Sequence, residues 1–393
     1  MEKKFLNAFV VDARRTAIGR SHPEKGALRN VRADALIAML IKEATTKAAT
    51  TKAATTKAVS PDAIDDVFIG CVGQHLEQGK NIARLSSLLA GLPDRVPGVT
   101  INRLCASSLQ ALNFAAMTLD RGDADIILAG GVEHMHHVPM AAALDYNQEL
   151  LGRYEFPFNN MGLTAEKVAE VYGISRREQD EFAFRSHKKA LEAQSKGHFA
   201  REIIPVTTPD GVFSKDQLPR ADTNIETLLA LKSSFKENGT VTAGNSSPLS
   251  DGASLTTLLS ADGLRRTGAK ARAQILDYAV VGIDPCLMGM GPVPAIQKLL
   301  GRSGFKVNDI DVFELNEAFA SQAIACMREL EISEDRVNLF GGAIALGHPL
   351  GCTGTRLITT LINVLESTDK EFGVTAMCVG HGQGVATLVR RMG

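Results

Sequence analysis

The chain has 393 residues, 45% of them hydrophobic and 22% charged, which is enough for two or three packed domains and excludes a small disulfide-stapled scaffold. Its 43 Lys and Arg residues nearly balance 44 Asp and Glu residues, so no global positive field exists to attract nucleic acid or anionic lipid. No apolar run approaches the roughly 20 residues that span a bilayer, and no signal peptide is recognisable, which predicts a cytoplasmic protein without membrane insertion.

Short apolar, β-branched segments alternate along the chain with longer stretches of helical period. The clearest of these segments span residues 7–11, 65–70, 124–130 and 274–281. This alternation is typical of an α/β protein with buried sheets. A duplicated unit is also indicated, because IDDVFIGC at residues 64–71 resembles IDVFEL at residues 310–315. We therefore expect two homologous α/β halves.

The stretch between the halves has a different character. Polar helical sequence at residues 176–197 and frequent Pro and Gly replace the strand pattern, so we expect an insertion carried by the first half. The expected division is an N-terminal half at residues 1–134 and 240–268, an inserted loop domain at residues 135–239 and a C-terminal half at residues 269–393.

Residues 44–58 hold three copies of the sequence ATTKA. This period matches neither the helical period nor the heptad, so no continuous apolar stripe can form. We expect a solvated helix end or loop there rather than a binding element.

Cys105 lies in the sequence INRLCASSLQALNFAA, where apolar residues recur at helical spacing after the cysteine. We expect a strand that ends near Ile101 and a helix that begins just after Cys105. A thiol at a helix N-terminus meets the positive end of the macrodipole and unpaired amide groups, which favour the thiolate. Cys105 is therefore a candidate nucleophile, although cysteine is also a common buried packing residue.

His348 lies in GGAIALGHPLGCTGTR at residues 341–356, where we expect a helix to begin near Cys352. This turn corresponds, in the second half, to the turn that holds Cys105 in the first. If a pseudo-twofold axis relates the halves, both turns face one crevice and His348 can accept the proton of the Cys105 thiol. The alternative is a histidine that only caps a helix or satisfies a backbone carbonyl.

Two further motifs supply candidates. MCVGHGQG at residues 377–384 places Cys378 at a strand end, before a glycine-rich backbone whose amide groups can point at an oxyanion. ELNEAFA at residues 314–320 places Asn316 and Glu317 at a strand exit. A polar pair there orients a water or a histidine, or simply caps a helix.

The remaining cysteines and a histidine cluster indicate no metal site. The six cysteines include no CxxC pair, so we expect free thiols. Those expected to be packing residues are Cys71, Cys286, Cys326 and Cys352. The cluster consists of His134, His136 and His137, whose side chains diverge. With no Cys or carboxylate at ligand spacing, we expect no zinc there.

Taken together, the motifs around Cys105, Asn316, His348 and Cys378 resemble those of the thiolase family. The resemblance extends along nearly the whole chain, from VVDARRTAIGR at residues 10–20 through GTVTAGNSSPLSDGA and MGMGPVPA to the last strand. It implies the thiolase fold, with two duplicated α/β halves, mixed five-stranded sheets in a layered αβαβα arrangement and an inserted loop domain. It also implies acyl transfer between a 3-oxoacyl-CoA and CoA, with CoA as a substrate and no metal or tightly bound cofactor.

The resemblance implies catalytic roles for the matching positions. The cysteine matching Cys105 carries the acyl group, and the histidine matching His348 activates it. The cysteine matching Cys378 exchanges a proton with the substrate α-carbon or the incoming thiol. The asparagine matching Asn316 holds a water that, with the histidine, stabilises the enolate. The backbone amides of Cys105 and Gly380 form the second oxyanion hole.

In related thiolases the insertion binds the pantetheine and adenine of CoA. The matching positions in this chain are Arg220, Phe235, Ala243, Ser247 and Phe319. Arg220 is suited to stack on adenine or to meet phosphate, although a lone arginine in a loop is more often a solvated surface charge.

Several motifs resemble the bacterial degradative thiolases, the β-subunits of a fatty-acid oxidation multienzyme complex. They are QHLEQGKNIAR at residues 74–84, GGVEHMHHVPM at residues 130–140 and NNMGLTAE at residues 159–166. The resemblance implies substrates of varied chain length, a homodimer or homotetramer, and an α-subunit partner. A short-chain acetoacetyl-CoA thiolase is the alternative.

Two residues depart from the family pattern near the expected site. His381 stands where thiolases usually have Gly or Leu, so its ring is expected to narrow the pocket or to alter its charge. Asn160 precedes Met161 at the place where the short-chain enzymes tend to have His.

Three other functions compete with the thiolase interpretation. A condensing enzyme of the ketoacyl synthase type is expected to use two histidines and no second catalytic cysteine, which MCVGHGQG disfavours. A catalytically silent acyl-CoA-binding protein has no need of intact Cys105, His348 and Cys378. A cysteine hydrolase releases free acid from acyl-CoA without added CoA.

Overall fold

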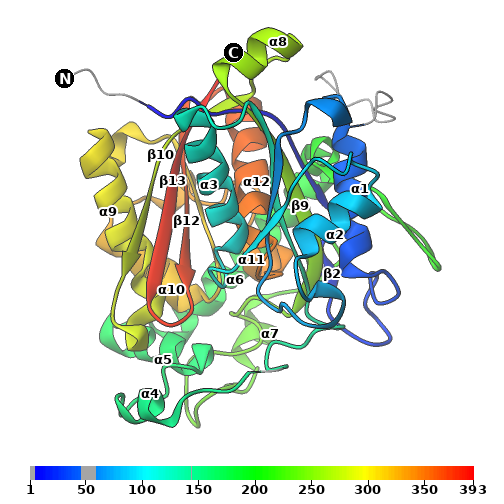
Figure 1. The fold of residues 1–393 in the computed structure, drawn as a ribbon. Coiled ribbons are helices and arrows are strands. Elements are labelled where there is room, and N and C mark those ends of the chain that lie inside the picture. Colours follow the sequence, from blue (N-terminus) through cyan, green and yellow to red (C-terminus); the bar gives the residue numbers. More distant parts are fainter. Residues whose placement is uncertain (1–4, 46–58, 143) are drawn as a thin grey trace.

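The computed structural model describes residues 5–45, 59–142 and 144–393, which are built around one large mixed β-sheet (Figure 1). Most of the ATTKA repeat lies outside the described residues, so the expectation for it stays a prediction. The strand order is β11-β12-β13-β10-β1-β9-β5-β3-β4. These strands are β1 (Phe9–Thr16), β3 (Asp66–Gly70), β4 (Val99–Ile101), β5 (Ile126–His134), β9 (Ser250–Leu259), β10 (Ala273–Gly282), β11 (Val312–Leu315), β12 (Phe372–Val379) and β13 (Gln383–Arg391).

Both halves of the sheet have the same pattern of strand directions. In the first half β4, β3 and β5 run parallel, and β9 is antiparallel to both β5 and β1. In the second half β11 and β12 run parallel, and β13 is antiparallel to both β12 and β10. Val337 bridges Phe313 in parallel, at the position that β4 has in the first half. The predicted α/β fold of two duplicated halves is confirmed, and the halves join edge to edge through β1 and β10.

Helices form the outer layers and a shared middle layer (Figure 1). The middle layer consists of α3 (Ser107–Arg121), which packs on β3 and β5, and α12 (Thr353–Thr368), which packs on β11 and β12; the two helices also contact each other. On the outside, α1 (Ala33–Thr45) and α2 (Ile82–Leu89) cover the first half, and α9 (Pro292–Ser303) covers the second. Helical layers and the two halves of the sheet therefore alternate as αβαβα. The expected five-stranded sheets are joined through β1 and β10 into one 11-stranded sheet.

Further helices and strands complete the described chain. They are β2 (Gly19–Arg20), α4 (Gln148–Gly152), α5 (Met161–Val171), α6 (Arg176–Ser195), β6 (Ile203–Ile204), β7 (Val206–Thr208), β8 (Gly211–Phe213), α7 (Ile225–Leu229), α8 (Ala261–Thr267), α10 (Ala320–Glu329) and α11 (Ala343–Leu346). Within the described ranges, no helix combines the length and the apolar character needed to cross a membrane.

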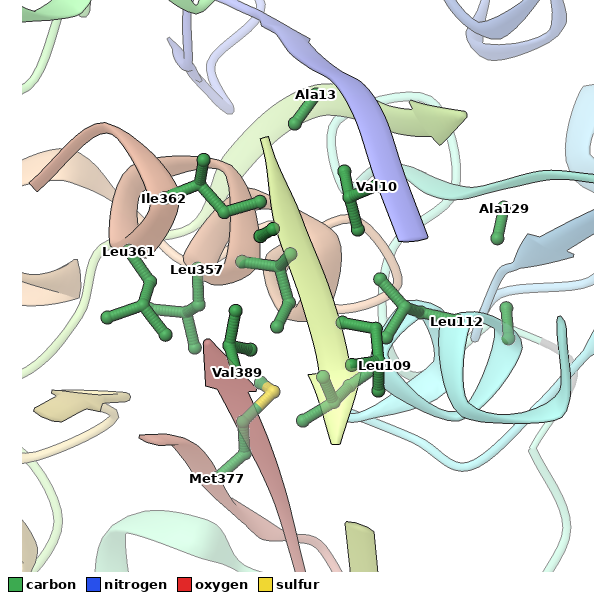
Figure 2. Packing of buried hydrophobic residues seen from close by; sticks show 14 of the residues in the cluster. Val10, Ala13, Leu109, Leu112, Ala129, Leu357, Leu361, Ile362, Met377 and Val389 are labelled. Atoms are coloured by element: carbon green, nitrogen blue, oxygen red, sulfur yellow. The ribbon is translucent and has the colours of Figure 1, made fainter. Parts of the chain in front are cut away.

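The two halves share one hydrophobic core in the middle layer. Figure 2 shows Leu109 and Leu112 of α3, Leu357 and Leu361 of α12 and Val389 of β13 in the same cluster of buried side chains. Burial of such side chains is the main favourable term in folding. Because both halves contribute to this cluster, the position of each central helix depends on the other.

The central helices cross at a point that has no room for a side chain. A Cβ on Gly354 would lie 2.3 Å from the backbone nitrogen of Leu109. Beside this contact, the amide N–H of Thr355 donates to Ser108 Oγ at 3.1 Å. Glycine at position 354 therefore lets the first turns of α3 and α12 touch.

A buried ion network attaches residues 202–216, within the stretch expected to be an insertion, to β1. Arg15 on β1 binds Glu202 Oε1 and Asp216 Oδ1, each at 2.7 Å. All three side chains are buried, and β6 of the insertion pairs with β1 in parallel. Because each charge has its partner, the network holds residues 202–216 against the sheet without leaving a buried charge unpaired.

Gly354→Ala is expected to lower the free energy of unfolding by about 1–3 kcal/mol, because the added methyl group overpacks the helix crossing. The measurement is denaturant unfolding of the full chain. Gly301→Ala in α9 is the matched control, because a Cβ there meets nothing within 4 Å, and it should leave stability equal or higher. Equal loss in both variants would show that the crossing tolerates a side chain.

Candidate active site

Cys105 lies in a tight turn between β4 and α3. Leu104 has a left-handed φ of 46°, and the Ser107 hydroxyl donates to the Leu104 carbonyl at 2.6 Å. β4 ends at Ile101 and α3 begins at Ser107. The expected strand, turn and helix around Cys105 are confirmed, and the turn fixes the cysteine just before the helix N-terminus.

Burial, rather than the helix N-terminus, decides the resting protonation of Cys105. Burial raises the pKa of its thiol to about 11, although the amide N–H groups of Gly380 and of Cys105 itself face the sulfur and partly oppose this. The expectation that the thiolate is favoured is therefore wrong for the resting protein. Cys105 is a neutral thiol near neutral pH and needs a base before it can act as a nucleophile.

His348 is a buried neutral imidazole in the loop before α12. Burial, and then the positive charge of Arg356, lower its pKa to about 3. Its Nδ1 lies 2.6 Å from Thr353 Oγ1, and the Thr353 hydroxyl donates its hydrogen to the Pro349 carbonyl at 2.8 Å. Thr353 must therefore accept from an Nδ1–H group, which leaves the lone pair of His348 on Nε2.

Asn316 faces His348 at the end of β11. Asn316 Nδ2 lies 3.4 Å from His348 Nε2, and the buried Asn316 Oδ1 has no hydrogen-bond partner among the described residues. The Glu317 carboxylate instead accepts a hydrogen bond from Ser186 Oγ at 2.7 Å. Phe319 occupies the cap position of α10, so the helix-cap alternative for Asn316 and Glu317 is wrong. Asn316 Oδ1 and His348 Nε2 present a polar pair to a ligand.

Cys378 is the second buried thiol of the site. Its apolar cluster also contains Ala165, Val241, Met288, Ala318 and Phe319. Burial, and then the nearby Cys105, raise its pKa well above the usual value. A Cβ on Gly380 would lie 3.1 Å from Leu104 Cδ1, which places the hairpin after Cys378 against the Cys105 turn. Cys105, Cys378 and Gly380 therefore come together, as do Asn316 and His348.

Glu133 links the turn of His348 to the first half. Its carboxylate accepts from the amides of Gly73 and Gly351, each at 2.9 Å, and from Val72 at 3.0 Å. Gly351 lies in the loop between His348 and α12. The sequence does not single out Glu133 or Thr353, because an acidic residue at a strand end and a threonine in a first helical turn are common.

Two of the five expected CoA-binding residues line one cavity. Arg220 and Ala243 line this cavity of about 240 Å³, together with His187, Leu228 and Ser246. The other three expected residues do not line it, although Phe319 forms a β-bridge with Ser246 of its lining. Ser247 donates its amide to the Ala318 carbonyl at 3.0 Å, and the rings of Phe235 and Phe319 stand edge to face with centroids 6.2 Å apart.

The histidine cluster has protein partners. His134 bonds the Leu28 carbonyl at 3.1 Å, and His137 bonds Glu77 at 2.9 Å and the Arg29 carbonyl at 2.7 Å. These carboxyl and carbonyl partners come from distant segments and tie the end of β5 to residues 28–33. In the part of the chain that the structure describes, no three His, Cys, Asp or Glu side chains are grouped to hold a metal ion.

The two residues that depart from the thiolase pattern have defined contacts. Asn160 caps α5, because its Oδ1 accepts from the amides of Gly162 at 3.1 Å and Leu163 at 3.2 Å. His381 lies in the hairpin after Cys378, and its Nε2 is 2.9 Å from the hydroxyl of Tyr146 in the insertion.

The chain matches two family models and many curated proteins. The models are the thiolase N-terminal domain over residues 8–262 and the thiolase C-terminal domain over residues 269–391. A 3-ketoacyl-CoA thiolase of Serratia proteamaculans is 50% identical over 98% of this chain and all of its own length. One of Erwinia tasmaniensis is 49% identical over 98% of this chain and 99% of its own. The chain belongs to the thiolase family.

Solved structures agree in fold. The crystal structure of the Bacillus anthracis acetyl-CoA acetyltransferase has a TM-score of 0.88 at 38% identity and covers 100% of both chains. The crystal structure of human mitochondrial 3-ketoacyl-CoA thiolase has a TM-score of 0.87 at 33% identity, covering 98% of this chain and 99% of its own. The layered thiolase fold is confirmed.

Cys105 should react with iodoacetamide as a thiol of raised pKa. With a pKa of about 11, the thiolate fraction rises about tenfold per pH unit at lower pH. We expect the alkylation rate, followed by mass spectrometry of the Cys105 peptide, to rise about tenfold per unit from pH 7 to pH 9, with Cys105→Ser as background. An alkylation rate that does not change between pH 7 and pH 9 would indicate a preformed thiolate–imidazolium pair and contradict the neutral resting state.

Proposed function

We propose that this chain transfers an acyl group from a 3-oxoacyl-CoA to CoA, releasing acetyl-CoA and a shortened acyl-CoA in fatty-acid β-oxidation. The observation that carries the proposal is the proximity of two thiols, the partly exposed Cys105 and the buried Cys378, beside the Gly380 amide. The Asn316–His348 pair lies at the turn before the helix that packs against the Cys105 helix. The curated relatives at about half identity bear the name 3-ketoacyl-CoA thiolase, which supports the same reaction.

In the proposed first half-reaction, His348 Nε2 takes the Cys105 proton and the sulfur attacks the substrate ketone carbon. The bond between the α- and β-carbons then breaks, which leaves the shortened acyl group on Cys105 and the enolate of acetyl-CoA. The Cys378 thiol gives its proton to the enolate α-carbon. The raised pKa of Cys378 supports this step, because it keeps the thiol protonated until the carbanion forms.

In the second half-reaction the Cys378 thiolate takes the proton of the incoming CoA thiol. The CoA sulfur attacks the Cys105 thioester, the shortened acyl-CoA leaves, and Cys105 recovers its proton from His348. Each residue then has its starting protonation state. We propose donors for both developing negative charges: the amides of Cys105 and Gly380 for one, and for the other the Nε2–H of protonated His348 together with a water held by Asn316 Oδ1. Preorganised donors of this kind are typically worth about 3–4 kcal/mol each.

CoA is proposed to bind as a substrate in the cavity lined by Arg220 and Ala243, with Ser247, Phe235 and Phe319 at its edge. The proposed division of the chain assigns this role to the inserted loop domain at residues 135–239. That domain joins an N-terminal half at residues 1–134 and 240–268 to a C-terminal half at residues 269–393. The position of Arg220 in the cavity supports an adenine or phosphate contact.

We also propose a homodimer or homotetramer, an α-subunit partner and a cytoplasmic location. Exposed apolar side chains on α2, β4 and α3 support self-association. They are Leu85, Leu88, Leu89, Val99 and Phe114. The cytoplasmic location is supported by the six cysteines, which all lie in described segments and are all free.

The proposal is tested by CoA-dependent loss of 3-oxoacyl-CoA, from acetoacetyl-CoA to 3-oxohexadecanoyl-CoA. Cys105→Ala should lower kcat/KM at least about a thousandfold because it removes the nucleophile, whereas Cys286→Ala, outside the site, should match wild type. Cleavage of long chains supports the β-oxidation role, and cleavage of acetoacetyl-CoA alone supports the short-chain alternative. Free acid released without CoA, or binding without cleavage, would overturn the thiolase proposal.

Thr353→Val is expected to lower kcat by at least about tenfold, because His348 then loses the acceptor that holds Nδ1–H and keeps the base on Nε2. The KM for CoA should change little. Thr359→Val is the matched control, because the Thr359 hydroxyl donates to the Thr355 carbonyl of the same buried helix at 2.8 Å. Equal kcat values for the two variants would contradict a positioning role for Thr353.

A further inference from the structure

His381 is held in an unusual backbone conformation beside the proposed site. It lies in the hairpin between β12 and β13 with a φ of 61°, in the left-handed region that residues with a Cβ rarely adopt. The preceding residue is Gly380, whose amide faces the Cys105 sulfur. Contacts of the imidazole ring must therefore compensate for a conformation that glycine adopts at no steric cost.

Those contacts join the hairpin to the insertion. His381 Nε2 lies 2.9 Å from the Tyr146 hydroxyl, and the rings stand edge to face with centroids 5.7 Å apart. Phe158 also contacts the imidazole edge to face, with centroids 5.9 Å apart and planes at 73°. Tyr154 packs on Phe158 in turn, with centroids 4.7 Å apart. Burial lowers the pKa of His381, so the ring is neutral and suited to this aromatic setting.

The same surroundings suit a saturated acyl chain. Leu104 and Met161 approach the Cα of Gly380, since a Cβ there would lie 3.1 Å and 3.6 Å from their side chains. Phe158 and Tyr146 contact His381, the residue after Gly380, and Leu144 and Leu150, close to Tyr146 in the sequence, are exposed apolar side chains. None of these residues lines the cavity of Arg220 and Ala243, so the CoA moiety has a separate place.

We propose that His381 and Tyr146 form a clamp that sets the chain-length specificity of the protein, closing the apolar surface along which the acyl group runs from Cys105. The inference rests on the proposed function for the position of the acyl group. Opening the clamp should raise the affinity and kcat/KM for long acyl chains, because each added methylene then contacts apolar side chains instead of the hydrogen-bonded imidazole. The backbone of His381 allows a clean test, since glycine fits its φ without strain.

The experiment measures dissociation constants of acetyl-CoA and hexadecanoyl-CoA, and kcat/KM for acetoacetyl-CoA and 3-oxohexadecanoyl-CoA. His381→Gly opens the clamp, and Tyr146→Phe removes its hydrogen bond while keeping the ring. Tyr172→Phe, at the C-terminal end of α5, is the matched control. We expect both clamp variants to shift affinity and kcat/KM toward the long chain by about tenfold, while the control keeps wild-type ratios.

The outcomes separate this inference from the proposed function. Wild-type thiolysis with unchanged or reversed chain-length ratios in His381→Gly would overturn the clamp and leave the thiolase reaction standing. A shift in the binding ratio without cleavage by any variant would support the clamp and overturn the reaction. A shift of the same size in Tyr172→Phe would also overturn the clamp, because the effect would then be general.

Discussion

The crossing of α3 and α12 is the constraint on which the rest of the structure depends. Gly354 lets the two helices approach until the Thr355 amide reaches Ser108. Each helix begins directly after a turn that carries a reactive side chain, so the crossing brings both turns into the interior of the same middle layer. The shared core of both halves then makes this arrangement a consequence of folding rather than of a flexible loop.

Burial determines the resting protonation states of Cys105 and His348. Two ionised side chains in this interior carry a large desolvation penalty, and both Cys105 and His348 shift toward their neutral forms. Proton transfer from the Cys105 thiol to the His348 imidazole is therefore unfavourable until hydrogen-bond donors of the site stabilise the negative charge that develops on the substrate. The amides of Gly380 and Cys105, which face the Cys105 sulfur, are fixed by the backbone, so in the proposed reaction they are donors that need no reorganisation.

The sequence predicted the features that depend on local pattern. Strand alternation and the repeated IDDVFIGC motif predicted the duplicated halves, and the segments around Cys105 and His348 predicted two strand-turn-helix units. It left open whether Asn316 caps a helix, because that depends on where α10 begins. It predicted a favoured thiolate wrongly, because burial by the other half is invisible to local pattern. Glu133 contacts backbone amides and Thr353 contacts the His348 ring, and neither contact gives the residue a motif of its own.

The insertion breaks the symmetry that duplication created. The halves share their strand directions, whereas in the proposed division only the first carries residues 135–239, of which Glu202 and Asp216 bind the buried Arg15. From there the insertion reaches the second half, where Tyr146 meets the hairpin of Cys378. Two equivalent turns thus face an environment that differs on its two sides, with a polar-edged cavity near Arg220 and aromatic rings near His381. These two surroundings are the places proposed above for the CoA end and the acyl end of the substrate.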